Sequence, residues 1–483
     1  MTTAASDRKL RIGPRATDSA AAAPVCGPRG AYIVFIIACL VMLASGDRQI
    51  LSILLVPIQK DLRVSDTGMG ALTGIAFTAV YATIALPLAR LTDVGVRRHI
   101  VTAAIAVWSV MTLSCGLASS YVTLLLARMG VASGEAVLHP AWTSMVGDFF
   151  SPKRRGTALA FIMLGGALGT SFCAFVAARL TDVYNWHVAF LALGVPGLLL
   201  AVVFYLTVPE PVRGASDGGQ QRDSSAQSWR GSIAHLASIA SVGPLLLGSI
   251  FTFLSFTSFT GWVPAYLMRV EGMSASSMGF WWMATTAPAV LGIPIGGTLS
   301  DLLARRGARW RLYYIAGSLA VGAPLFCAVL IAHDLRIILS MLFIYAIVVG
   351  PVVAIIPATY LDVTPPRLRG TMVAAGSFCA NVVGAGLGPV VIGAVNDQVK
   401  LYHGLHSLRY SLIVLPVFML AAALMLLWAS RTADRDAEAA RTGNTAPGRQ
   451  KPRGSPQNQR VGRRKPHVIR VGAAGSQRRP HHE

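Results

Sequence analysis

Two adjacent residues of opposite charge, Asp47 and Arg48, lie inside an apolar run that extends from residue 31 to residue 58. This run is longer than the roughly 20 residues that cross a bilayer, so both charges would lie near mid-membrane. A charge at that depth costs about 2.5–3.5 kcal/mol on insertion scales and is tolerated where it faces a bundle interior or a watery cavity. The pair is either a structural ion pair or, the interpretation we favour, a substrate or proton site on a transport path.

A later apolar run carries a second set of ionisable residues. Arg128 and Glu135 are seven residues apart, about two helical turns, so they share one face of a helix. His139 follows Glu135 by four residues and lies on that face too. Asp47 and Arg48 point about 100° apart on their own helix, so we expect pairing between helices, Arg48 with Glu135. His139 is either a second proton group or a packing residue.

Composition places the chain in a membrane. Its 483 residues are 54% hydrophobic and only 13% charged, and the mean hydropathy is +0.57. A soluble domain is closer to a quarter charged. The net charge of +21 comes largely from polar ends, where it indicates topology or attraction to anionic lipid rather than nucleic-acid binding. The six cysteines form no CxxC pair, and we expect no disulfide framework, metal site or cofactor.

About twelve apolar runs fall into two groups of six, which predicts an all-α membrane protein with two six-helix halves. The expected parts are a disordered cytoplasmic N-terminus (1–30), an N-terminal bundle (31–208), a cytoplasmic linker (209–241), a C-terminal bundle (242–430) and a disordered basic tail (431–483). The linker and tail have too little apolar content to fold alone.

Charge in the short loops predicts the orientation. One set of alternate loops holds the basic clusters at residues 97–98, 153–155, 305–311 and 367–369, and the opposite set is sparse. Loops rich in Lys and Arg stay in the cytoplasm. With an even number of spans, both termini and the linker are expected on that same side, in a bacterial inner membrane.

The two groups of runs repeat each other. Pro57 and Pro264 correspond at an offset of 264 − 57 = 207, and Asp93 and Asp301 at 301 − 93 = 208. The similarity extends to Pro-Lys-Arg-Arg-Gly-Thr at 152–157 and Pro-Arg-Leu-Arg-Gly-Thr at 366–371. Each half has six spans and enters from the same side, so the repeat is parallel, as in transporters that alternate access between two halves.

These motifs resemble the major facilitator superfamily and, within it, the spinster-like group, over roughly residues 31–430. The matching segments are Asp47-Arg48-Gln49, Leu88-Ala89-Arg90-Leu91-Thr92-Asp93, Ala127-Arg128-Met129-Gly130 with Gly134-Glu135-Ala136, Trp262 to Arg269, and Ser407-Leu408-Arg409-Tyr410. The chain departs from the superfamily's loop motif at Ala89 and Val94, and from the usual small residues after Glu135 at His139-Pro140.

The resemblance implies that the first, fourth, seventh and tenth helices line a central cavity. Asp47, Arg48, Arg128 and Glu135 would then converge on its N-terminal side. Asp47 or Glu135 would take up a proton as its charge partner changes between two transport states, because burial and a nearby Arg act oppositely on a carboxyl. Asp47 is the first candidate.

The loop motif is expected to gate rather than to bind substrate. Asp93 and Asp301 would cap the helices that begin near Gly370 and Gly156, where an acid gains about 0.3–1 kcal/mol beside the helix dipole. The remaining charges of this cytoplasmic gating motif would form a latch that breaks on inward opening; they are Arg97, Arg98, Asp148, Arg155, Arg305 and Arg306. The alternative is a static, solvated basic loop.

The C-terminal half offers hydroxyl and aromatic residues but no charge in its seventh run. A cavity polar on one wall and apolar on the other suits an amphiphile, and the resemblance implies the same, since some spinster-like members move lysolipids or sphingoid phosphates. We predict a monomeric, proton-coupled secondary transporter of an amphiphile. The alternatives are a symporter of small organic anions, held by Arg48 and Arg128, and a membrane sensor with the tail as its output. No nucleophile–base pair or metal-ligand spacing indicates an enzyme.

Overall fold

The computed structural model describes residues 27–211 and 229–442, which lie within one compact unit. The expected disorder of residues 1–26 and of 443–483 lies outside these described ranges. The described chain is helical almost throughout, because long apolar segments satisfy their backbone hydrogen bonds internally.

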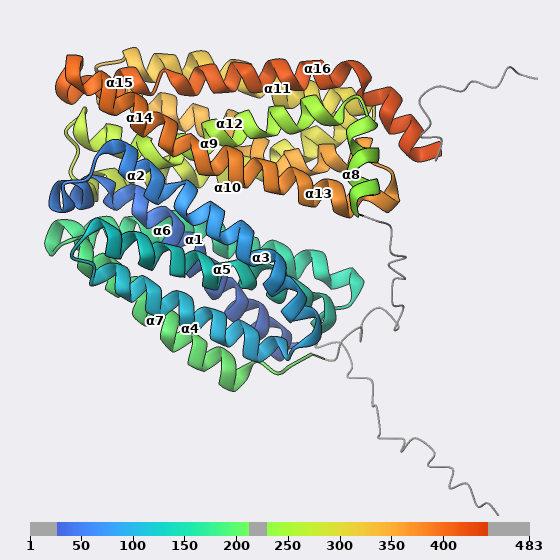
Figure 1. Ribbon diagram of the computed structural model, residues 1–483, viewed down its shortest axis with the longest axis horizontal. Helices are drawn as coiled ribbons and strands as arrows, with labels where there is room; N and C mark the ends of the chain where they lie inside the picture. The colour runs from blue at the N-terminus through green and yellow to red at the C-terminus, as the bar shows by residue number, and fades with distance from the viewer. Residues whose placement is uncertain (1–26, 212–228, 443–483) are drawn as a thin grey trace, which may run out of the picture. The chain divides into compact units, whose positions relative to one another are not determined.

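The first half contains helices α1 to α7. Their bounds are α1 Pro28–Leu62, α2 Asp66–Thr73, α3 Ile75–Val94, α4 Arg97–Gly116, α5 Tyr121–Phe149, α6 Pro152–Val183 and α7 Trp186–Thr207. Helices α2 and α3 meet at Gly74 and together make one pass. Figure 1 shows this half as a layer of its own, with α1 and α6 side by side.

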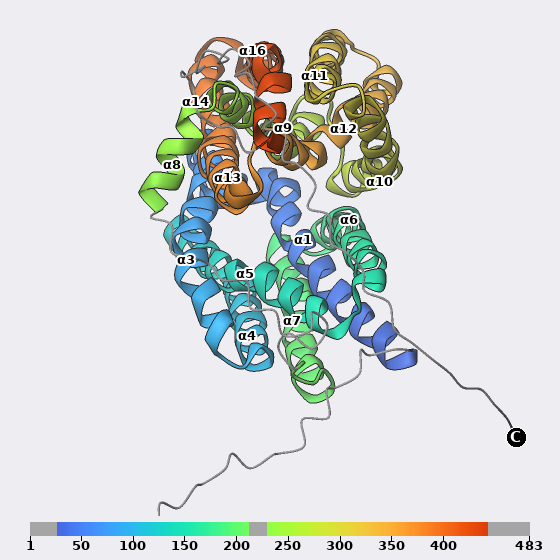
Figure 2. The same cartoon turned by 90° about the vertical axis from the view of Figure 1, so that its right-hand side faces the viewer.

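The second half contains the remaining helices. Their bounds are α8 Trp229–Ser238, α9 Val242–Arg269, α10 Ala275–Ala304, α11 Ala308–Ile331, α12 Leu335–Val363, η1 Pro366–Leu368, α13 Arg369–Phe378, η2 Cys379–Ala385, α14 Gly386–His403, η3 Gly404–His406, α15 Ser407–Ser411 and α16 Val414–Thr442. The seven-residue π-helical turn η2 joins α13 to α14 without a break in the helix. In Figure 2, where the helices are seen nearly end-on, this half lies above α1–α7.

Ten described segments are long and apolar enough to cross a membrane. The last of them, Pro366–Thr442, turns back on itself at η3 and so contains two passes, and α10 is a further helix of 30 residues. The described chain therefore agrees with the predicted twelve spans.

One predicted boundary is wrong, and the predicted linker is partly helical. Helix α16 continues to Thr442 instead of ending at 430, because Ala433 and Ala437 are buried and Asp436 accepts a hydrogen bond from the Ser241 amide at 2.9 Å. The linker is not wholly irregular, since it contains α8, whose Leu236 is buried and which contacts α9 and α13. In both segments, a few small or apolar residues pack against neighbouring helices. The average composition of a segment does not reveal such contacts.

The internal repeat is visible in side-chain contacts. Arg97 pairs with Asp148 at 2.5 Å, and Arg311 pairs with Asp362 at the same distance. Both members shift by the same offset, since 311 − 97 = 214 and 362 − 148 = 214. Each pair joins the start of one helix to the end of the helix that follows it, α4 to α5 and α11 to α12.

The halves touch most closely at the end where α1 finishes and α2 begins, which we call the gate end. A Cβ on Gly70 would lie 2.4 Å from the Pro389 carbonyl oxygen, and one on Gly393 would lie 2.3 Å from the Asp66 carbonyl oxygen. Helix α2 therefore packs backbone to backbone on α14. Beside them, α6 packs on α10, where Asp182 accepts a hydrogen bond from the Ser276 amide at 2.7 Å.

Close approach of α1 and α6 also depends on glycine, because helix association in lipid relies on packing between small residues. A Cβ on Gly169 would lie 2.0 Å from the Met42 carbonyl oxygen, whereas Gly147 of α5 has open space around it. We expect Gly169→Ala to lower stability by about 1–3 kcal/mol through overpacking. The matched control Gly147→Ala should be neutral or slightly stabilising. Thermal unfolding of the purified variants measures both, and equal melting temperatures would contradict the prediction.

Candidate substrate site

A cavity of about 620 Å³ lies between the halves. Two charged residues line it, Arg48 from α1 and Arg128 from α5, and both belong to the first half. The opposite wall is uncharged and is formed by aromatic, hydroxyl and amide side chains, among them Phe253, Phe256, Thr257, Thr260, Ser377, Phe378 and Asn381. The site is therefore positively charged on one wall and largely apolar on the other.

Arg48 forms the predicted pair with Glu135. Its Nε lies 2.5 Å from Glu135 Oε2, and its guanidinium carbon lies 5.4 Å from the Phe77 ring centre and 5.3 Å from that of Tyr81. The Arg48 side chain is 50% exposed, whereas Glu135 is 1% exposed. Glu135 Oε1 is buried with no hydrogen-bond partner among the described residues. The Arg48 guanidinium is thus reachable from the cavity, whereas only one of the two Glu135 carboxylate oxygens has a hydrogen-bond partner.

Asp47 pairs with Arg128, which lines the central cavity but is only 2% exposed. Arg128 NH1 lies 2.8 Å from Asp47 Oδ2, and Thr112 of α4 donates a hydrogen bond to Asp47 Oδ1 at 3.1 Å. Asp47 is fully buried and lines none of the three described cavities. All four residues expected to converge do so, but as two pairs of different kinds: one sealed and one open.

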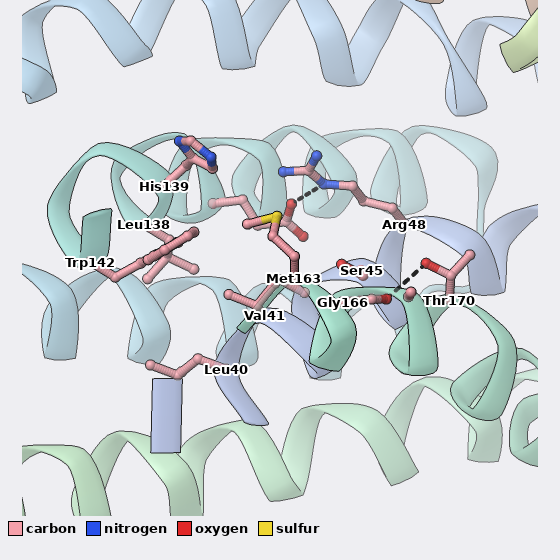
Figure 3. Close-up of a pocket in the computed structure, with 13 residues that line it drawn as sticks. Leu40, Val41, Ser45, Arg48, Leu138, His139, Trp142, Met163, Gly166 and Thr170 are labelled. Carbon is pink, nitrogen blue, oxygen red and sulfur yellow. Dashed lines mark hydrogen bonds and ion pairs between the residues drawn. The ribbon is translucent and has the colours of Figure 1, made fainter. Parts of the chain in front are cut away.

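His139 lies in a second cavity, of about 320 Å³, which also contains Arg48 and Glu135. The other lining residues come from α1, α5 and α6 and are mostly apolar; Figure 3 shows Leu40, Val41, Trp142 and Met163 among them. His139 is exposed, and its ring meets Trp142 edge-on at 5.2 Å between centres. The two cavities share Ser45, Arg48 and Thr170, so they adjoin at the ion pair.

A third cavity, of about 190 Å³, extends from the central one into the second half. It shares Gln49, Thr260 and Phe256 with the central cavity. Its deeper walls are apolar and aromatic; they include Phe259, Trp282, Ile293, Tyr345 and Val349. Phe259 stacks on Tyr345 with ring centres 4.6 Å apart. A ligand held at Arg48 therefore has an apolar branch within the same space.

Glycines bring the charged residues together. A Cβ on Gly46 would lie 2.4 Å from Cys173 Cβ, so Gly46 allows α1 to approach α6 directly beside Asp47. A Cβ on Gly134 would lie 2.8 Å from the Ala104 carbonyl oxygen, so Gly134 allows α5 to approach α4 directly beside Glu135. Each glycine precedes an ionisable residue, and the approach it permits encloses that residue.

The residues predicted to form the cytoplasmic gating motif lie at the end of the bundle opposite the gate end. Arg97 is 2% exposed and binds Asp148 at 2.5 Å and Glu210 at 3.0 Å. Glu210 also accepts the Arg98 amide hydrogen at 2.7 Å. Sequence reasoning missed Glu210, which it assigned to the linker. In the second half it also missed Asp362, which the offset of 214 from Asp148 would have found.

The predicted helix cap by Asp301 is not seen among the described contacts of this conformation. Asp301 is 75% exposed and pairs with Arg311 of its own half at 2.6 Å. Asp93 lies near the end of α3, and its side chain is outside the described part of the chain. Arg155 donates to the Phe150 carbonyl at 3.0 Å, while Arg305 and Arg306 are exposed at the end of α10. The caps stay a prediction for a state in which this end closes.

A polar cluster at the gate end was not predicted. We call it the gate cluster: Gln59, Asp66, Thr67, Arg269, Asn396 and Asp397. The Asp397 carboxylate accepts the amide hydrogens of Asp66 at 2.9 Å and Thr67 at 2.8 Å. The buried Asp66 carboxylate accepts from Arg269 at 2.8 Å, and from Gln59 and Asn396 at 2.7 Å each. These contacts join the two halves. Their sequence signal was weak, because they come from α1, α2, α9 and α14, and α9 and α14 are far from α1 and α2 in the sequence.

Comparison with known proteins agrees with this architecture. The model of the Major Facilitator Superfamily matches residues 37–389. An "MFS-type efflux pump" of Mycolicibacterium smegmatis is 31% identical, over 83% of this chain and 93% of its own length. A bacterial homologue of the human lysosomal transporter Spinster, solved in an inward-facing, unoccupied conformation, is similar with a TM-score of 0.76 and 25% identity, over 85% of this chain and 99% of that one.

Other relatives are named for different substrates. The hexuronate transporter of Bacillus subtilis is 26% identical, over 76% of this chain and 88% of its own length. The sphingosine-1-phosphate transporter SPNS2 of Danio rerio is 25% identical, over 79% of this chain and 81% of its own length. The matched family model, the twelve-pass fold and the cavity between two similar halves lead to one conclusion: the chain belongs to the major facilitator superfamily of membrane transporters.

Proposed function

We propose that this secondary transporter moves an anionic amphiphile in exchange with, or together with, protons. The observation that carries the proposal is the cavity wall on which Arg48 offers a half-exposed guanidinium opposite an uncharged aromatic wall. An anionic headgroup would bind Arg48, and an apolar chain would enter the branch lined by Phe259 and Trp282. The substrate named for the zebrafish relative, sphingosine 1-phosphate, has this character.

The mechanism follows from competition for Arg48. A substrate anion that binds its guanidinium draws it away from Glu135, and the buried carboxylate is left without a cation. A buried charge is costly unless it is compensated, so a proton enters the pocket in its place. Glu135, rather than Asp47, is the group we assign to coupling. Asp47 remains with Arg128 as a sealed structural pair that holds α1 against α5.

The proposed orientation follows the positive-inside rule, which puts the loop between α3 and α4, with Arg97 and Arg98, in the cytoplasm. The gate end would then face the periplasm, and the conformation would be inward-facing, like the similar bacterial spinster homologue. Opening to the other side would require the gate cluster to part, while the loop motif of Asp93 and Asp301 forms its caps. This is alternating access in the cytoplasmic membrane.

Exchange of Glu135 for Gln separates coupling from folding. We expect Glu135→Gln to fold and to transport at a rate that no longer changes between about pH 6 and pH 8, because no carboxylate needs compensation. Asp47→Asn should instead lower stability by about 3–5 kcal/mol, because it leaves Arg128 buried without a partner. Proteoliposome flux at several pH values and thermal unfolding distinguish the two effects. Wild-type pH dependence in folded Glu135→Gln would refute the coupling assignment.

The amphiphile is tested against the alternative of a small organic anion, as the hexuronate relative suggests. Binding of fatty carboxylates to protein in nanodiscs should tighten roughly fourfold per methylene, corresponding to about 0.8 kcal/mol each. Phe259→Ala should weaken that gain, whereas Phe161→Ala, which is 59% exposed on α6, should not. Tighter binding of glucuronate than of dodecanoate would favour the small anion.

A non-transporting sensor is tested by truncation. Removal of residues 443–483 leaves the described helices whole, so we expect undiminished flux from a transporter and lost signalling from a sensor. A second truncation, from residue 431, serves as a contrast: it removes Asp436, which holds the Ser241 amide, and Asp434, which pairs with Arg309 at 3.1 Å. That variant should melt at a lower temperature.

A further inference from the structure

His139 has a place in the site that neither ion pair uses. It lies four residues after Glu135 on α5, where side chains are neighbours with Cβ atoms about 5–6 Å apart. Its ring contacts Trp142 edge-on. No hydrogen bond from its imidazole is found among the described residues, and the side chain is exposed to the cavity that contains Arg48 and Glu135. The imidazole is therefore free to rotate.

Glu135 supplies the second observation. Its carboxylate is buried, and only Oε2 is engaged, by Arg48, while Oε1 has no partner. A buried carboxylate oxygen without a partner is costly, and a donor within reach would stabilise it. Since the backbone of α5 separates the two residues by just over one turn, a change of rotamer brings the imidazole to the carboxylate.

The other groups around His139 leave it as the available donor. From α1, Arg48 is the charged residue that lines this cavity, and from α5 it is Glu135. Helix α6 contributes Met163, Gly166, Ala167 and Thr170, none of which titrates. Asp47 and Arg128 are both buried and neutralise each other. When Arg48 turns to a substrate, His139 is thus the remaining group in this cavity that can bring a positive charge to Glu135.

We propose that His139 carries the coupled proton: as substrate draws Arg48 from Glu135, the imidazole takes a proton from the cavity and donates a hydrogen bond to the Glu135 carboxylate. This inference rests on the function proposed above and deepens it. The charges balance. Before binding, Arg48 and Glu135 cancel and His139 is neutral. After binding, the substrate anion cancels Arg48 and the imidazolium cancels Glu135. One proton therefore accompanies each monoanionic headgroup.

The test needs no substrate, because Arg48→Ala imitates the withdrawal of Arg48. In ¹⁵N-histidine NMR spectra at pH 7, we expect His139 to be neutral in the wild type, charged in Arg48→Ala and neutral again in Arg48→Ala/Glu135→Gln. His99, exposed at the start of α4 beside Tyr205, is the internal control, and its signals should be the same in all three proteins. The His139 signals are assigned as those that disappear in the His139→Gln variant. Arg48→Gln serves as a second variant should Arg48→Ala fold poorly.

A neutral His139 in Arg48→Ala would overturn the proposal, because the proton would then reside on Glu135 itself. Measurements of transport flux distinguish a failure of the His139 proposal from a failure of the assignment of coupling to Glu135. With His139 as the carrier, His139→Gln should reduce the proton uptake that accompanies transport at pH 7 by about tenfold, while His139→Arg, whose guanidinium stays charged, should transport without proton uptake. If Glu135→Gln keeps wild-type pH dependence, the proposed function fails, whatever the state of His139.

Discussion

Two ion pairs between α1 and α5 determine how this site can work. The α1 members are adjacent in the sequence, and the α5 members are about two helical turns apart. The two pairs nevertheless differ in exposure: Asp47 and Arg128 are both buried, whereas the Arg48 side chain of the other pair is half-exposed. In a low-dielectric interior, both pairs are strong, and the separation of either is expensive unless another charge replaces the lost partner. The enclosed pair exposes almost nothing of its cation and nothing of its carboxylate, so it fixes the helices. The open pair can accept a replacement charge, which makes exchange of partners possible.

The rest of the fold keeps that exchange local. Lipid provides little hydrophobic drive between helices, so association depends on close packing and on polar contacts. Glycines at 46 and 169 hold α1 to α6, and those at 70 and 393 hold α2 to α14. Among the described residues, the gate cluster adds its hydrogen bonds between the halves at one end of the cavity. Alternating access requires rigid halves, a gate held by hydrogen bonds and, in the proposed mechanism, an ion pair whose partners can exchange.

Recognition of the substrate divides between the halves. The first half contributes guanidinium groups, whereas the second contributes a branch of aromatic and apolar side chains next to hydroxyl and amide groups. Relatives of similar identity are named for hexuronate and for sphingosine 1-phosphate, both anions but of opposite polarity in the remainder of the molecule. In this chain, the wall opposite Arg48 is what would select between a polar and an apolar remainder.

The sequence by itself determined the helical architecture, its two similar halves and the residues that carry charge into the membrane, because long apolar runs and mid-run charges leave few alternatives. It also predicted the Arg48–Glu135 pair from helical spacing. Tertiary structure alone decided that Asp47 is enclosed while Arg48 is open, since two residues 100° apart on one helix differ only in what packs against them. It likewise decided the end of α16 at Thr442 and the gate cluster, because Asp66, Arg269 and Asp397 belong to three helices far apart in the sequence, α2, α9 and α14, whose meeting depends on how the halves close.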